Sequence, residues 1–317
     1  MQRTSIMSEN WTLDTFTVAT TTPEGDKDVL YANGTMQVLV VVTVSAVNDD
    51  NTPHMLTDDE LSSIKLIDYY NPSSDLSDGW TYSTIENRYD HTIGSPTAEE
   101  TVAIDLSPPK QFQRYWVSTA TVEGKDIGAS IKAQDGSVVD TSGSGTFDSK
   151  VNITGIKPID VHFEDLDLWQ DTNTANGDIG SDYFYDQDNY YLTIKNQNVR
   201  FLDCYGFDGG SSDPNLYRSI AVFSNGLLCY IGYWWPVGPT SEVTAGFRDV
   251  NVKITVNQQK DAACLTRLLI GGPRIWNTHQ RWEAKFTVYD QYGNSCVFYP
   301  KWVDDGNTLQ LSKSRTD

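Results

Sequence analysis

The sequence lacks long hydrophobic runs: no stretch of about 18 apolar residues, the minimum that suggests a membrane helix, occurs anywhere in it. The amino terminus, Met-Gln-Arg-Thr-Ser-Ile-Met-Ser-Glu-Asn-Trp, also lacks the apolar centre of a signal peptide. A transmembrane helix and a secretion signal are therefore not expected. We expect the chain to be cytoplasmic when synthesised, with any release occurring by lysis or by a route without a signal.

Basic residues are scarce as well. The chain has 23 Lys and Arg against 43 Asp and Glu, a formal net charge of −20. So negative a surface repels phosphate groups, and we expect neither nucleic acid nor an anionic membrane as a partner. The charge is uneven, because residues 160–188 hold nine acids and no Lys or Arg, whereas residues 189–317 hold 13 basic and 11 acidic residues.

Cysteine and histidine are rare, with four of each. The cysteine spacings fit no zinc-binding pattern, and the missing signal peptide favours buried free thiols over disulfides; the cysteines are Cys204, Cys229, Cys264 and Cys296. No histidine lies in a zinc-protease motif, and neither a nucleophile elbow nor a P-loop is found. We predict no catalytic residues.

What the chain does contain is strand patterning and turn residues. Every second residue from Met36 to Ala46 is Met, Val or Ala, which predicts a central strand, and the polar tract Asn48–Pro53 ends it. Thr57 and Glu60 form a capping box for one short helical turn. Further strands are predicted at 64–70, 80–84, 101–106, 112–122, 127–133, 150–154, 190–194, 199–205, 216–223, 227–234, 250–256, 282–289 and 296–302. Short strands separated by turn signals are typical of a β-sandwich.

Lys157-Pro158 is the best boundary between domains, because the charge balance changes there. Residues 1–158 carry a net charge of −13, and the remainder carries −7. We predict an all-β protein of two β-sandwich domains in tandem, immunoglobulin-like or jelly-roll-like. The first covers residues 1–158, and the second, rich in aromatic residues, covers 159–317.

Two segments resemble the immunoglobulin-like repeats of bacterial invasin and intimin adhesins. The first is Tyr31-Ala32-Asn33-Gly34 with the valine strand and the tract Asn48–Pro53, and the second is Phe286–Asn294. The resemblance implies a β-sandwich and, more distantly, adhesion. Adhesins of that class are exported through a signal peptide, which this sequence lacks.

A cluster of aromatic residues in the second half is the candidate binding surface: Tyr230, Tyr233, Trp234, Trp235, Trp276 and Trp282. Exposed Trp and Tyr stack on sugar rings and anchor protein interfaces, but they also fill cores. Because neighbours on a strand point to opposite faces, we expect Trp234 or Trp235 to be exposed. Our leading hypothesis is a non-enzymatic protein that recognises a glycan or a cell-surface protein.

Residues 160–188, the acidic tract, supply the oxygen ligands that Ca²⁺ prefers. The candidate ligands are Asp165, Asp167, Asp171, Asp178 and Asp182, in an irregular site between the domains. The alternative interpretation is a solvated acidic linker.

Two other functions stay open. Residues 128–154 are rich in Ser, Thr and Gly and end in alternating apolar positions, as do the membrane-inserting hairpins of bacterial pore-forming or insecticidal toxins, and a membrane partner belongs to that alternative alone. An acidic glycoside hydrolase needs only two carboxylates, and Asp290 lies beside aromatic residues.

Overall fold

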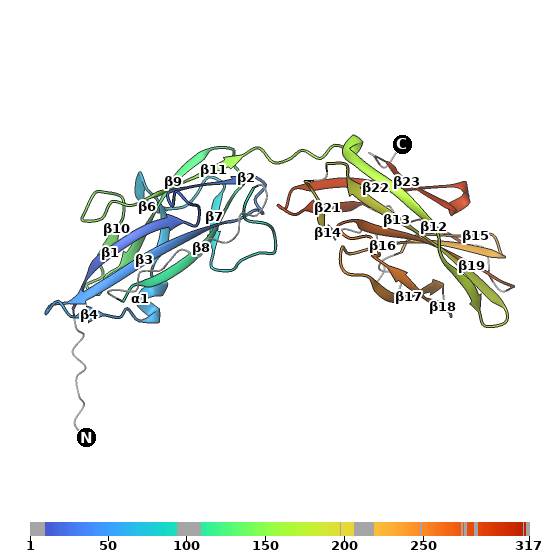
Figure 1. Cartoon of the computed structure of the whole chain (residues 1–317), viewed down its shortest axis with the longest axis horizontal. Helices are drawn as coiled ribbons and strands as arrows, with labels where there is room; N and C mark the ends of the chain where they lie inside the picture. The colour runs from blue at the N-terminus through green and yellow to red at the C-terminus, as the bar shows by residue number, and fades with distance from the viewer. Residues whose placement is uncertain are drawn as a thin grey trace, which may run out of the picture. The chain divides into compact units, whose positions relative to one another are not determined.

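A computed structural model of the chain describes residues 10–93, 109–196, 198–205, 219–247, 249–273, 275, 278–281, 285–312 and 314. The chain divides into two compact units, Met1–Ile159 and Asp160–Asp317, each built from β-strands (Figure 1). Of the described residues, 59% lie in strands and 4% in helices, so the prediction of an all-β protein with β-sandwich domains is confirmed. In the described residues, no helix has the length and hydrophobicity needed to span a membrane.

The first unit contains two sheets. One has the order β1 (Trp11–Thr20), β3 (Val38–Asn48), β8 (Gln111–Thr119) and β7 (Trp80–Ser83), with β4 (Pro53–His54) paired to β3. The other has the order β2 (Lys27–Tyr31), β11 (Val151–Ile156), β9 (Gly124–Lys132), β5 (Lys65–Asp68) and β6 (Asn71–Asp75), with β10 (Val138–Asp140) paired to β9. Helix α1 (Asp58–Ser62) begins with the capping box of Thr57 and Glu60, as predicted.

Apolar residues that alternate along the central strands form the core of this unit. Val38, Val40, Val42 and Val44 of β3 are completely buried, and β3 lies between β1 and β8 as a central strand should. In the second sheet, Ile127, Val151 and Ile153 are buried to the same extent. Each sheet therefore contributes one apolar face to a single core.

The segment assigned to a membrane-inserting hairpin is part of this core. Residues 128–154 include much of β9, all of β10 and the start of β11. Strand β11 lies between β2 and β9, and its Val151 and Ile153 have no exposed surface. Releasing the segment would open the centre of the sheet, so the structure gives the toxin alternative no support.

Asp28 on β2 has an unusual titration range. Its half-buried side chain lies on the same face of β2 as the fully buried Leu30. Burial raises the pKa of Asp28 from 3.8 to about 6, although Val29 N–H donates a hydrogen bond of 2.8 Å to the carboxylate. Because the folded-state pKa lies above the ordinary value, the ionised carboxylate destabilises the unit above about pH 6, and this penalty shrinks as the pH falls toward 4.

Asp28→Asn is therefore expected to raise the free energy of unfolding of the first unit by about 1–3 kcal/mol at pH 7.5, at about 1.4 kcal/mol per pKa unit. At pH 4 the substitution should have little effect. Amide hydrogen exchange in β2 and β11 at both pH values measures the difference. An equal gain at both pH values would show that ionisation of Asp28 is not the cause.

The second unit also contains two sheets, with an additional hairpin. The larger sheet has the order β12 (Leu166–Ile179), β13 (Tyr183–Ile194), β19 (Ala263–Gly271), β16 (Leu228–Trp235), β15 (Ser219–Ser224) and β20 (Thr278–Arg281). The smaller has the order β14 (Phe201–Tyr205), β21 (Phe286–Asp290), β22 (Ser295–Val303) and β23 (Thr308–Ser312). The hairpin consists of β17 (Ser241–Phe247) and β18 (Val250–Val256). All four cysteines are buried and free, as predicted.

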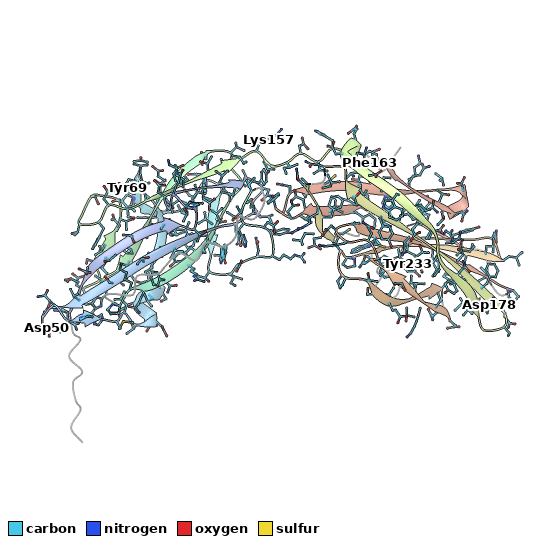
Figure 2. All side chains as sticks on the ribbon, viewed as in Figure 1. Asp50, Tyr69, Lys157, Phe163, Asp178 and Tyr233 are labelled. Atoms are coloured by element: carbon cyan, nitrogen blue, oxygen red, sulfur yellow. The ribbon has the colours of Figure 1, made fainter. Side chains whose placement is uncertain are left out.

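The hairpin covers the face of the larger sheet that the smaller sheet leaves open. Ala245, Ile254 and Val256 of the hairpin pack in one cluster with Ile231 and Tyr233 of β16. The Tyr233 hydroxyl (labelled in Figure 2) donates to Gly246 O at 2.8 Å and accepts from Gly246 N at 3.0 Å. Both faces of the larger sheet are consequently used for packing.

Candidate functional site

The adjacent tryptophans of β16 are both buried, so the expectation that one of them is exposed is wrong. Trp234 is 6% exposed and Trp235 is 3% exposed. Trp234 packs edge-on against Phe286 of the smaller sheet, with ring centroids 5.5 Å apart, and Trp235 stacks with Tyr233 beneath the hairpin. One face of β16 was expected to be exposed to solvent. The smaller sheet instead covers one face, and the β17–β18 hairpin covers the other.

The other predicted aromatic residues form no exposed surface in the described part of the chain. Tyr233 is 2% exposed, and Tyr230, on the same face of β16 as Trp234, is half-buried. Trp276 and Trp282 lie outside the described residues. The four predicted aromatic residues that the structure describes therefore do not form a shared exposed surface.

The five aspartates proposed as calcium ligands are spread along a strand and its turn. Asp165 closes the turn before β12, accepting from His162 N at 3.0 Å, and Asp182 lies in the turn between β12 and β13. Asp167, Asp171 and Asp178 are on β12. Within the described ranges, no three His, Cys, Asp or Glu side chains converge on a metal position. The tract is neither an assembled ion site nor a linker, because most of it is β12 and the first half of β13.

Strand β12 is an edge strand with a β-bulge. Its register with β13 shifts between Asp171 and Ala175, and Asn173 in the bulge has a positive φ of 55°. Bulges bend a strand and change the direction of its side chains, and they are common beside functional sites. The bulge separates two halves of the acidic tract.

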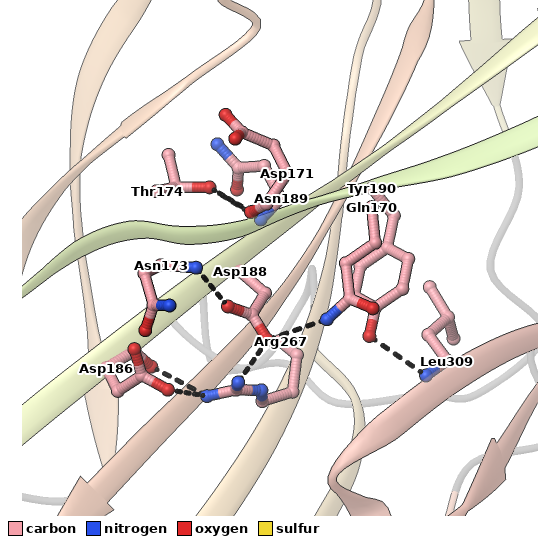
Figure 3. A network of polar contacts seen from close by, with 10 residues as sticks. All are labelled: Gln170, Asp171, Asn173, Thr174, Asp186, Asp188, Asn189, Tyr190, Arg267 and Leu309. Atoms are coloured by element: carbon pink, nitrogen blue, oxygen red, sulfur yellow. Dashed lines mark hydrogen bonds and ion pairs between the residues drawn. The ribbon is translucent and has the colours of Figure 1, made fainter.

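A buried ion-pair network holds one side of the bulge (Figure 3). Arg267 of β19 is 4% exposed; its Nη1 donates to Asp186 Oδ2 at 2.7 Å, and its Nη2 pairs with Asp188. Asp188 also accepts from Gln170 Nε2 at 2.8 Å and from Asn173 N at 2.7 Å. Asp188 therefore connects the bulge of the edge strand to the centre of the sheet.

Hydrogen bonds of Thr174 and Asn189 hold the other side of the bulge. Thr174 Oγ1 donates to Asp171 O at 2.7 Å and accepts from Asn189 N at 2.9 Å. The Asn189 side chain accepts from Thr266 Oγ1 at 2.6 Å and donates to Gln258 Oε1 at 2.8 Å. Asp188 and Asn189 of β13 thus tie the bulge to β19, which gives the edge strand a fixed shape.

Trp169 is an aromatic residue that this arrangement leaves at the surface. It lies two residues before Asp171 and two after Asp167, so the three side chains lie on one face of β12, and 42% of Trp169 is exposed. Its ring lies 5.1 Å from that of Tyr191, at an angle of 36°. Burial raises the pKa of Tyr191 to about 12, so its hydroxyl stays protonated and donates to Gln258 Oε1 at 2.7 Å.

We call Asp167, Trp169 and Asp171 the Trp169 strip. Trp169 is not among the predicted binding residues, although the alternation of Asp, Trp and Asp with period two is a signal for it.

Asp290, which the sequence offered as a carboxylate of a glycoside hydrolase, has a structural role. It is 1% exposed, and its carboxylate accepts from Tyr292 N, Asn294 N and Asn294 Nδ2, each at 2.9 Å. Burial raises the pKa of Asp290 despite these hydrogen bonds. The side chain closes the turn between β21 and β22, at the end of the segment that resembles the adhesin repeats.

No family model and no curated protein matches the sequence. Among solved structures, the chain is similar to the adhesin InvE of Yersinia pseudotuberculosis, with 11% identity and a TM-score of 0.20, covering 92% of this chain and 59% of that one. It is also similar to the C-terminal domain of the AgI/II polypeptide BspA of Streptococcus agalactiae (8%, TM-score 0.21, covering 89% and 97%). A third is the C-terminal domain of the antigen I/II-family protein AspA of Streptococcus pyogenes (10%, TM-score 0.23, covering 89% and 96%).

These neighbours support the resemblance to adhesin repeats only in part: they show a weak structural likeness to β-rich domains of bacterial adhesins. The chain spans 59% of the length of InvE.

Proposed function

We propose that the chain is a non-enzymatic binding protein that recognises a glycan or another cell-surface partner through the Trp169 strip. The observation that carries the proposal is Trp169, a tryptophan with 42% of its surface exposed between two carboxylates on a bulged edge strand. This binding surface lies in the second unit but is formed by β12, and not by the tryptophans of β16.

The chemistry of the strip fits a sugar. An indole ring offers an apolar face to the C–H groups of a pyranose, while the exposed Asp167 and half-buried Asp171 can accept hydrogen bonds from its hydroxyls. The anchored bulge begins at Asp171, and the ring of Tyr191 lies against Trp169, so part of the strip is ordered before binding, which lowers the entropic cost of association.

Size and charge favour a neutral glycan among the partners. Three side chains cover far less than the roughly 800 Å² that each partner contributes to a stable protein interface. Apart from Asp186 and Asp188, which pair with Arg267, the acids of residues 160–188 repel sialylated or sulfated sugars. A neutral oligosaccharide meets neither obstacle.

Trp169→Ala is expected to weaken binding of a neutral oligosaccharide about tenfold, the effect of losing about 1.4 kcal/mol of stacking. The wild-type chain is screened on a glycan array, and its best neutral ligand is then titrated against the variants. Trp169→Phe should retain part of the affinity.

Leu227→Ala serves as the matched control, since Leu227 is an exposed apolar residue of the same unit at 67%. It should bind as the wild type does. Equal affinities for wild type and Trp169→Ala would remove the strip as the binding site, and retention of a cell-surface protein but no glycan would change the class of partner.

A further inference from the structure

One turn of the first unit consists of two aromatic residues. Tyr69 and Tyr70 form the tight turn between β5 and β6, where Asp68 pairs with Asn71. Neither tyrosine has a positive φ, and Tyr70 N donates to Asp68 Oδ1 at 3.0 Å, so the turn forms without a contribution from either ring. The two rings are therefore free to make contacts outside the turn.

The two rings are held in a defined geometry. They meet edge to face, with centroids 5.2 Å apart and planes at 87°. The Tyr69 hydroxyl donates to Asp148 Oδ1 at 2.6 Å, and Lys150 Nζ lies 4.7 Å from the Tyr69 centroid and 5.0 Å from the Tyr70 centroid. Each contact restricts a side chain that would otherwise rotate freely in solvent.

Lys150 is itself fixed by the sheet. Its Nζ donates to Asp126 Oδ2 at 2.7 Å and to the Tyr70 hydroxyl at 3.0 Å, and Asn152 Nδ2 donates to Asp126 Oδ1 at 2.7 Å. These bonds use two of the three donors of a lysine ammonium group. Despite them, 74% of Tyr70 and 39% of the Lys150 side chain are exposed. The result is a rigid aromatic surface beside polar groups (Tyr69 is labelled in Figure 2).

We propose that this surface, the tyrosine–lysine platform of Tyr69, Tyr70, Lys150 and Asp148, is a second ligand site that takes a neutral pyranose sugar. The apolar face of the sugar stacks on the exposed Tyr70 ring. Sugar hydroxyls accept from Lys150 and donate to the exposed Asp148 carboxylate. Because the rings are already ordered, little side-chain entropy is lost on binding.

The charges around the platform determine the class of sugar. Three carboxylates, those of Asp68, Asp126 and Asp148, surround it, with two ammonium groups, Lys150 and Lys125, which pairs with Asp68 at 2.8 Å. The local balance is negative, and Asp126 already neutralises Lys150. A sialylated or sulfated sugar would therefore be repelled, whereas a neutral one would not.

The site is independent of the Trp169 strip, so the test uses the full chain carrying Trp169→Ala. This chain is applied to an array of neutral, sialylated and sulfated oligosaccharides, and the best neutral ligand is titrated. We expect binding to a neutral oligosaccharide to persist. Adding Tyr70→Ala should weaken it at least tenfold, whereas adding Tyr70→Phe, which keeps the ring, should change it less than about threefold.

Val122→Ala is the control in the same unit, because Val122 is 60% exposed and lies outside the platform. It should not alter the affinity. The proposal is overturned if the Trp169→Ala chain binds no neutral oligosaccharide, if it binds only anionic ones, or if Tyr70→Ala has no effect. If Tyr70→Ala matters and Trp169→Ala does not, the platform stands and the Trp169 strip falls; the reverse result has the opposite meaning.

Discussion

Arg267→Met is expected to lower the free energy of unfolding of the second unit by about 3–5 kcal/mol, the usual cost of removing one partner from a buried ion pair. Methionine retains most of the apolar stem but leaves Asp186 and Asp188 without the guanidinium that pairs with both. The side chain of Asp188 is only 5% exposed, so water cannot replace the lost partner. Urea unfolding followed by amide hydrogen exchange in β13 and β19 measures the change.

Two variants test the cause of that loss. Lys253→Met breaks an exposed pair with Glu242, in which both side chains are more than two-thirds exposed, and should cost less than about 0.5 kcal/mol. Asp188→Asn added to Arg267→Met removes the unpaired charge and should recover part of the stability. If Arg267→Met costs less than about 1 kcal/mol, the network is not what fixes the bulge of β12.

The strand and cap predictions succeeded where the signal was local. The valine alternation from Met36 to Ala46 reflects one buried face, and β3 (Val38–Asn48) follows it closely. The capping box of Thr57 and Glu60 needs only four residues, and it forms as predicted. Each pattern is complete within a few neighbouring positions of the chain.

The prediction for the acidic tract failed because the signal was not local. Nine acids without a basic residue suggest solvent or a cation, yet Asp188 is buried because its partner, Arg267, comes 79 positions later. Pairing of β13 with β19 places the two side chains opposite each other. No local pattern reveals such a partner, so the sequence could not distinguish a buried ion pair from a solvated tract.

The predicted exposure of Trp234 or Trp235 was wrong because the sequence pattern of a strand does not reveal how many layers cover the strand. Alternation correctly places Trp234 and Trp235 on opposite faces of the sheet. The smaller sheet covers one face, and the β17–β18 hairpin, which follows β16 in sequence, covers the other. One exposed aromatic residue, Trp169, lies instead on an edge strand that the hairpin leaves partly open.

Trp235→Ala is therefore expected to behave as a core truncation and to lower the free energy of unfolding of the second unit by about 3–5 kcal/mol. The indole fills the space between the larger sheet and the hairpin, where it packs with Tyr233 and Ala245. Its Nε1 also donates to Thr266 Oγ1 at 2.7 Å, so the truncation removes a buried hydrogen bond as well. Chemical unfolding and hydrogen exchange in β17 and β18 measure the loss.

Phenylalanine substitutions separate packing from hydrogen bonding. Trp235→Phe should cost about 1 kcal/mol more than Trp234→Phe, because Trp234 Nε1 has no hydrogen-bond partner within the described part of the chain. Both variants should bind glycans as the wild type does. If Trp235→Ala abolished binding while leaving the unit as stable as before, the indole would be a ligand contact after all, and the hairpin would have to open to expose it.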